Sequence, residues 1–272
     1  MFYNLDKFKN NKLNDSNSLR DILKRDRFIV VSGLFVISIL SWLYIIYLYR
    51  QMEVMNMDAL FFSMPMTPSW TMVDFALLFL MWFVMMIAMM TPAVAPLILI
   101  FLMVNRQRKQ QSRPYVNTAY LMTGYFLVWA AFSFAATSLQ WLLQQISLMN
   151  PEMKTTNKIL GSVILIAAGI FQFTPLKHTC LQNCRSPFQF VQRHWREGKR
   201  GALRMGIQNG IYCLGCCWML MALLFVAGIM NLMWIALIAL FVLVEKISFR
   251  VKWIPYVAGL LLIVYGVILL IR

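Results

Sequence analysis

Residues 73–104 read VDFALLFLMWFVMMIAMMTPAVAPLILIFLMV, an apolar run in which Asp74 is the only charged residue. The hydrocarbon core of a bilayer is about 30 Å thick and is crossed by roughly 20 residues of α-helix, so this run exceeds what one crossing needs. Pro92 and Pro96 lie inside it and lack backbone donors, which predicts a kink. The stretch therefore predicts a bent helix that spans a membrane.

The composition of the whole chain agrees with a lipid environment. Of its 272 residues, 61% are hydrophobic and 13% are charged, whereas soluble globular proteins are about 45–50% apolar and about 25% charged. Such a chain has too little polar surface to cover itself in water. Disorder is excluded because it needs low hydrophobicity, and five cysteines are too few for a disulfide scaffold.

Working outward from residues 73–104, apolar runs long enough to cross a membrane recur along the chain. We expect an all-α, polytopic helix bundle of about seven spans, at residues 28–49, 73–104, 116–146, 159–176, 207–229, 231–245 and 253–271. The boundary between the fifth and sixth spans depends on one turn signal, residues 228–231. Residues 1–27 form a basic cytoplasmic leader, and residues 28–272 form a single transmembrane domain with a cytoplasmic loop at 177–206.

The basic residues predict the orientation of this bundle. With the N-terminus inside and the C-terminus outside, 21 of the 25 Lys and Arg residues fall on the cytoplasmic side. This asymmetry is what the positive-inside rule requires of a membrane protein. The net charge of +15 is therefore mainly a topology signal, and we expect no nucleic-acid partner.

Methionine is concentrated on the opposite, outer side, where eleven of the 21 methionines lie between positions 52 and 90. Thioethers are soft ligands that favour Cu(I) over hard cations and need no deprotonation. The outer segment after the first span therefore predicts a Cu(I) collection site, made of Met52, Met55, Met57, Met64 and Met66. Asp74, at the outer mouth of the next span, could assist cation entry.

Five more methionines continue into the span at 73–104. Residues four apart share a helix face, so Met81, Met85 and Met89 form one row, and Met86 and Met90 form an adjacent one. These rows predict a ladder of sulfur atoms along the helix. The alternative is that the methionines are only flexible apolar filler.

All five cysteines lie at the inner ends of two consecutive spans. Cys180 and Cys184 are four residues apart, close to His178, and the second set is Cys213, Cys216 and Cys217. Cytosolic thiols stay reduced, so metal ligation or redox chemistry is a more natural use than a disulfide. We expect Lys177 and Arg185 to favour thiolate, and the two cysteine sets to be able to meet in space. Simple helix packing remains the alternative, above all for the second set.

Other chemistry-bearing patterns are few. Glu245 beside Lys246 is expected to form an anchor pair at the membrane interface. The sequence has no phosphate-binding Gly-Lys-Ser/Thr loop, no His-Glu-X2-His helix and no dinucleotide fingerprint. It therefore offers none of these three enzyme motifs, and energy from ATP would have to come from a partner.

Four blocks of the chain together resemble a known family. They are Met81-Trp-X2-Met-X2-Ala-Met-Met-X-Pro92, Gly124-Tyr-X-Leu-Val-Trp129 with Leu139-Gln-Trp141, Thr174-Pro-Leu-Lys177 with Cys180-X3-Cys184-Arg-Ser-Pro187, and Gly210-X-Tyr-Cys-X-Gly-Cys-Cys-Trp218. This pattern is similar to a bacterial family of unknown function described as predicted metal-binding integral membrane proteins. The resemblance covers residues 52–247 and implies a multi-pass protein of the inner membrane that binds metal, without supplying a reaction.

The sulfur ligands lead to three hypotheses. The first is a copper-handling protein that relays Cu(I) between outer methionines and inner cysteines, exchanging it with a periplasmic or membrane metal-handling protein. The second is an assembly factor or scaffold for a partner metalloenzyme. The third is a thiol-redox protein that uses Cys180 and Cys184, or Cys213 and Cys216.

Overall fold

The computed structural model describes residues 27–51, 71–111, 115–146, 158–248 and 253–271. Within these ranges the chain is helical and has no β-strand. Helix Arg27–Gln51 comes first. It is followed by α2 (Met72–Gln110), α3 (Ala119–Gln145), α4 (Lys158–Phe171), α5 (Pro175–Arg185), α6 (Pro187–His194), α7 (Gly198–Ala222), α8 (Leu224–Ala227), α9 (Leu232–Ile247) and α10 (Ile254–Ile271).

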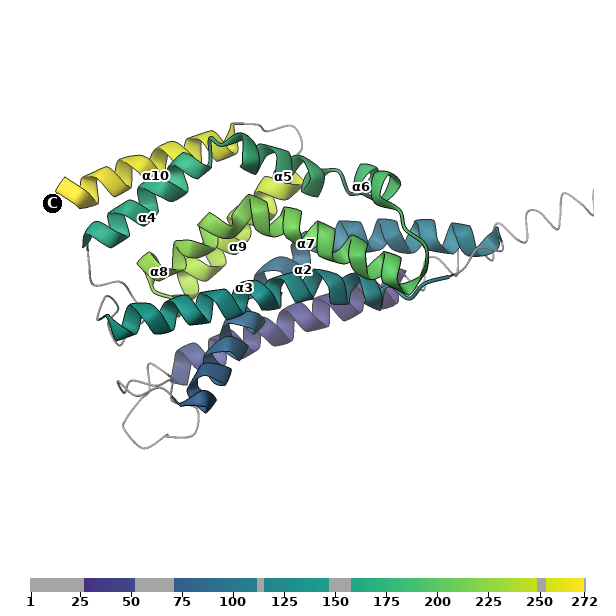
Figure 1. Ribbon diagram of the computed structural model, residues 1–272, viewed down its shortest axis with the longest axis horizontal. Helices are drawn as coiled ribbons and strands as arrows, with labels where there is room; N and C mark the ends of the chain where they lie inside the picture. The colour runs from purple at the N-terminus through teal and green to yellow at the C-terminus, as the bar shows by residue number, and fades with distance from the viewer. Residues whose placement is uncertain (1–26, 52–70, 112–114, 147–157, 249–252, 272) are drawn as a thin grey trace, which may run out of the picture.

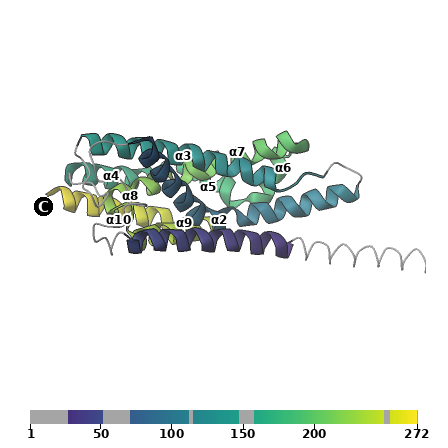
Figure 2. The same ribbon diagram turned by 90° about the horizontal axis from the view of Figure 1, so that it is seen from below.

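Most of the long helices run along the long axis of the molecule (Figures 1 and 2). Five of the described helices are long and apolar enough to cross a membrane, and a bent pair, α4 with α5, would be a sixth. The expected all-helical fold with membrane-length helices is thus confirmed for the described residues. α9, with 16 residues, is not among the five. The count of seven spans and the orientation stay predictions, and the leader at 1–26 lies outside the described residues.

The expected fourth span is broken. α4 ends at Phe171 and α5 starts at Pro175, with a 62° bend between them. Thr174 caps α5 by accepting a hydrogen bond from the backbone N–H of Lys177. A Thr followed by Pro is a helix-start signal, so the sequence carried the cue for this break.

α2 is a single helix of 39 residues that contains both Pro92 and Pro96, and it changes direction along its length (Figure 2). The Thr91 hydroxyl donates to the carbonyl oxygen of Ile87 at 2.6 Å, a back-bond that also favours bending. The predicted kink is therefore present. Because of this kink, the axes of the two halves of α2 run in different directions through the bundle.

Glycines let α3 and α7 approach backbone to backbone. A Cβ added at Gly206 would run into the Leu121 carbonyl, and one at Gly124 would run into the Leu203 carbonyl. Small residues at a helix crossing allow the two backbones to pack closely. Such packing is the main source of attraction between apolar helices in lipid, because lipid tails are as apolar as the side chains. The α3–α7 crossing places Tyr125 of α3 against Cys213 of α7, with 3.0 Å between the Tyr125 oxygen and the sulfur.

α4 and α10 form a second close pair at one edge of the molecule (Figure 1). A Cβ added at Gly169 would lie 2.7 Å from the Gly259 carbonyl oxygen, and one at Gly259 would lie 2.9 Å from that of Gly169. The core of the bundle includes the buried Trp82 of α2, whose indole N–H donates to the Gln140 side-chain oxygen of α3 at 2.8 Å.

Candidate functional site

A small cavity lies where several helices converge around two thiols. Its volume is about 20 Å³, which is room for about one water-sized or ion-sized particle. The lining residues come from α2, α3, α5, α6, α7 and α9: Ala93, Pro96, Leu97, Tyr125, Cys184, Pro187, Asn209, Cys213 and Lys246.

Of the two thiols that line this cavity, Cys213 makes the larger number of contacts with polar side chains. The Lys246 ammonium donates to its sulfur at 2.8 Å, and the Tyr125 oxygen lies 3.0 Å from it. All three residues are at least 93% buried, and a buried ammonium is costly unless an anion pairs with it. A Cys213 thiolate is the anion that this contact supplies.

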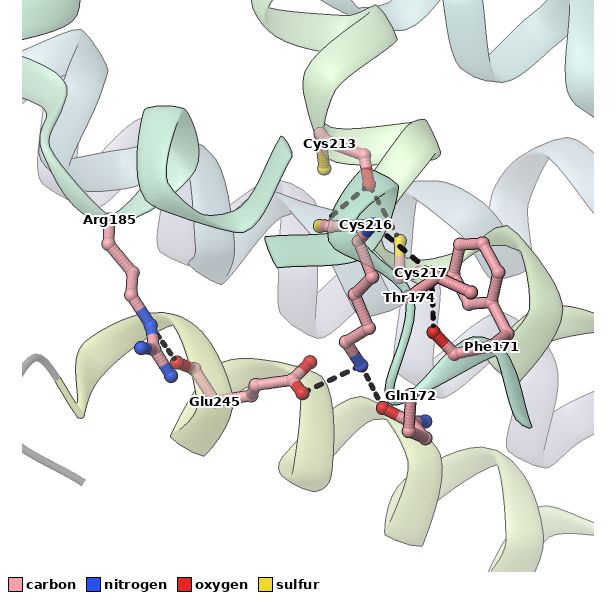
Figure 3. Close-up of polar contacts among 9 residues, drawn as sticks. Phe171, Gln172, Thr174, Arg185, Cys213, Cys216, Cys217 and Glu245 are labelled. Atoms are coloured by element: carbon pink, nitrogen blue, oxygen red, sulfur yellow. Dashed lines mark hydrogen bonds and ion pairs between the residues drawn. The ribbon is translucent and has the colours of Figure 1, made fainter. Parts of the chain in front are cut away.

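The structure brings the two cysteine sets together. Cys184 of α5 and Cys213 of α7 line the same cavity, and Cys216 is about one helical turn after Cys213. The thiols of Cys216 and Cys217 donate to the Cys213 carbonyl oxygen at 3.1 and 2.9 Å (Figure 3). None of the five cysteines forms a disulfide.

Cys180 lies against α7 one turn before Cys184. A Cβ added at Gly215 would lie 2.8 Å from the Cys180 sulfur. Gly215 therefore makes room for this thiol, and α5 packs on α7 through sulfur at two successive turns.

A buried ion pair lies next to the thiols. The Lys177 ammonium is 2.7 Å from a Glu245 carboxylate oxygen, and both side chains are almost completely buried. Lys177 also donates to the Gln172 side-chain oxygen, and Arg185 Nε donates to the Glu245 backbone carbonyl at 2.8 Å (Figure 3). This network ties the start and the end of α5 to α9.

These contacts change two expectations about charge. Glu245 and Lys246 do not form an interfacial anchor pair, because both are buried and each has a different partner. Lys177 and Arg185 turn toward Glu245, while the cation at the Cys213 thiol is Lys246. Consecutive residues of a helix point about 100° apart, so neighbours in sequence serve separate partners.

The methionine rows of α2 lead toward the same cavity. Met81, Met85, Met86, Met89 and Met90 are all at least 98% buried. Ala93, which lines the cavity, is four residues after Met89 and three after Met90. It therefore follows both rows at the next helical turn.

Other candidate residues lie apart from the thiols. The His178 ring packs against Tyr256 of α10, with 5.2 Å between ring centroids. Asp74 completes a capping box at the start of α2, accepting hydrogen bonds from the backbone N–H and the hydroxyl of Thr71, both at 2.8 Å. The outer candidates Met52, Met55, Met57, Met64 and Met66 fall outside the described residues.

Within the described ranges, no group of three or more His, Cys, Asp or Glu residues is arranged so that it could hold a metal ion. That grouping does not count methionine. The cysteine thiols are thus arranged as close pairs, and the methionine thioethers of α2 are arranged as rows. Neither arrangement surrounds a metal ion on all sides with His, Cys, Asp or Glu ligands.

Sequence reasoning missed Lys246, Tyr125 and Asn209 as parts of the site. Lys246 follows an apolar run, as an ordinary interfacial lysine does, so only the rotation of α9 shows that it faces Cys213. Tyr125 was visible only as part of the Gly124-Tyr block. The signal that could have found it is the glycine beside it, which marks a close crossing.

The fold and the site define an all-helical chain with several membrane-length helices and a buried cluster of thiols and thioethers. A model of the family PpoB2, described as copper chaperone, matches residues 79–269, which is more than half of the chain. The protein therefore belongs to this copper chaperone family. The match includes the rows of α2 and every residue that lines the cavity, and the expected association with copper is confirmed at the level of the family. No curated protein and no solved structure matches the chain.

Proposed function

We propose that this protein is a membrane copper chaperone that relays Cu(I) between methionine thioethers and a thiol pair at the cavity. Copper is its cargo. Cys213 and Cys184 would hold the ion at the thiol end, with Cys216 as an exchange partner. The methionines of α2 would carry it to or from that end.

The observation that supports this most strongly is the course of α2. Its two rows of buried methionines are followed, one turn later, by Ala93 at the cavity that Cys184 and Cys213 line. Methionines used only as filler have no reason to align with a thiol site. Soft sulfur ligands of both kinds favour Cu(I), and Cu(I) is stable with as few as two of them, so a closed cage is not needed.

The charges near the cavity suit a monovalent ion. Cu(I) bound by two thiolates carries one net negative charge, and the Lys246 ammonium, 2.8 Å from Cys213, balances it. A neutral assembly is what a low-dielectric interior tolerates best. Binding of the second thiol releases one proton, because only one thiolate is compensated before the metal arrives.

We further propose the membrane arrangement that the basic residues predict. The bundle would have seven spans in the bacterial inner membrane, with α9 and the bent α4–α5 pair included and the N-terminus inside. The outer methionines Met52, Met55, Met57, Met64 and Met66 would then face a periplasmic or membrane copper donor or acceptor. Cysteine-accessibility labelling of each loop from either side of intact cells tests this topology.

Methionine replacement tests the relay itself. We expect the combined change of Met85, Met86, Met89 and Met90 to Leu to lower copper stoichiometry in the purified full-length protein loaded with Cu(I). The matched control changes Met103, Met122, Met219 and Met233 to Leu, four methionines that are not on the rows and are not fully buried. Unchanged copper binding in the first variant, or no copper in the parent, would refute the proposal.

A second candidate function is the delivery of copper to a partner metalloenzyme without passage across the membrane. The family description, copper chaperone, favours it because a chaperone hands on its cargo. Sealed liposomes containing the protein separate the two. Copper accumulation in the lumen supports a relay across the membrane, and its absence with normal copper binding supports delivery alone.

A further inference from the structure

A second, larger cavity lies between α5 and α6, beyond the turn that follows Cys184. Its volume is about 450 Å³, within the range of small-molecule sites. We call it the α5–α6 groove. It is lined by Thr179, Gln182, Asn183 and Ser186 from α5 and its end, and by Gln189, Phe190 and Arg193 from α6.

The groove is polar, which is unusual for a ligand pocket. Phe190 is its only apolar lining residue, and Arg193 is its only charged one. Within the described chain, no hydrogen bond joins the side chains of Gln182, Gln189 or Arg193 to another residue. The groove thus offers amide donors and acceptors together with one guanidinium, and it contains no acidic group. This chemistry fits a small anion that carries amides.

The dimensions of the groove match a short peptide. Thr179 on α5 and Ser186, the C-cap of that helix, are seven residues apart, which is about 10 Å at roughly 1.5 Å per residue. An extended chain covers roughly 3.3 Å per residue, so about three residues fit along this wall. Arg193 can pair with a carboxylate through two parallel hydrogen bonds.

The position of the groove relates it to the thiol cavity. Ser186 lines the groove and Pro187, the next residue, lines the thiol cavity together with Cys184. Cys184 is also the least buried of the five cysteines, since the other four are classed as buried. A ligand in the groove would therefore lie next to the chain segment that carries Cys184, the one cysteine that is not fully buried as a residue.

We propose that the α5–α6 groove binds an anionic thiol tripeptide, which exchanges Cu(I) with Cys184. The exchange part rests on the function proposed above, whereas the binding part does not. In the exchange, a copper–sulfur bond forms to the incoming thiolate as the bond to Cys184 breaks. The proton of the incoming thiol passes to the Cys184 thiolate that is released, and copper remains Cu(I) throughout.

Binding is tested with copper-free, full-length protein in nanodiscs. The probe is S-methylglutathione, whose sulfur cannot exchange as a thiolate, and isothermal calorimetry measures its affinity. We expect saturable binding that Arg193→Gln weakens at least tenfold. Arg200→Gln, which removes the same charge from an exposed site outside the groove, should leave the affinity unchanged. Absent binding, or equal binding by the two variants, overturns the proposal.

Two further arms identify the ligand chemistry and separate the two proposals. Glycerophosphoglycerol, a lipid headgroup probe, should bind more weakly than S-methylglutathione, and tighter binding would overturn the peptide assignment. In copper-loaded protein, Arg193→Gln should slow copper transfer to glutathione but not to dithiothreitol, which has neither charge nor amides. If copper does not bind at all, the proposed relay fails while the calorimetry still decides whether the groove takes the peptide.

Discussion

The α3–α7 and α4–α10 crossings both depend on glycines, but the side chains beside the two crossings differ. Each brings two backbones together at glycines, Gly124 and Gly206 in the first and Gly169 and Gly259 in the second. The α3–α7 crossing holds Tyr125 and Cys213 in contact at its edge. The α4–α10 crossing is bordered by Ile263, Phe173 and the aliphatic stem of Gln172, and no thiol of the described residues is in contact with it.

This difference shows that close packing and chemistry are separable in the bundle. Charged groups buried in a protein interior are expensive unless they are paired. Lys177, Glu245 and Lys246 are all buried beside the thiols of α5 and α7. We therefore expect changes near the α3–α7 crossing to affect copper, and changes at the α4–α10 crossing to affect stability alone.

The largest expected effect is on the buried ion pair beside the thiols. Glu245→Leu leaves the Lys177 ammonium buried without its partner, which should destabilise the protein by about 3–5 kcal/mol. The double variant Lys177→Met with Glu245→Leu removes both charges and should recover most of that loss. Unfolding in mixed detergent micelles measures both. A single variant as stable as the parent would show that the pair does not contribute.

Alanine at one glycine of each crossing tests the separation directly. Gly206→Ala drives a Cβ into the Leu121 carbonyl, and Gly169→Ala drives one to within 2.6 Å of Ile263 Cγ1. Each should cost about 1–3 kcal/mol of stability, as overpacking does. Gly206→Ala should also lower copper affinity, because it separates Tyr125 from Cys213, whereas Gly169→Ala should leave copper affinity unchanged.

Gly33→Ala serves as the control for these two variants, since nothing lies within 4 Å of a Cβ added there. It should leave both unfolding and copper titration unchanged. Equal loss of copper affinity in Gly206→Ala and Gly169→Ala would mean that the two crossings are coupled, and the comparison between them would fail.

Much of this architecture could be read from the sequence, for reasons that are local. Apolar runs predicted the helices, Pro92 and Pro96 predicted the bent α2, and the four-residue spacing of Cys180 and Cys184 predicted a shared face. Which lysine meets a thiol could not be read in this way. Lys177 and Lys246 both lie beside apolar runs, and the choice depends on how α5 and α9 rotate about their axes when they pack on α7. Such rotations are set by tertiary contacts among many side chains.

The smallest expected effect concerns one hydroxyl at each crossing. Tyr125→Phe removes the oxygen 3.0 Å from the Cys213 sulfur, and a single hydrogen bond is worth about 0.5–1.5 kcal/mol. Because Lys246 still donates to the same sulfur, the thiolate keeps its charge partner, and copper affinity should fall only about three- to tenfold. Tyr256→Phe on α10 keeps the ring that packs on His178 and should leave copper affinity unchanged. Competition with a chromogenic Cu(I) chelator resolves a change of this size. If both variants bind copper as the parent does, the Tyr125 hydroxyl only fills space, and Lys246 alone maintains the thiolate.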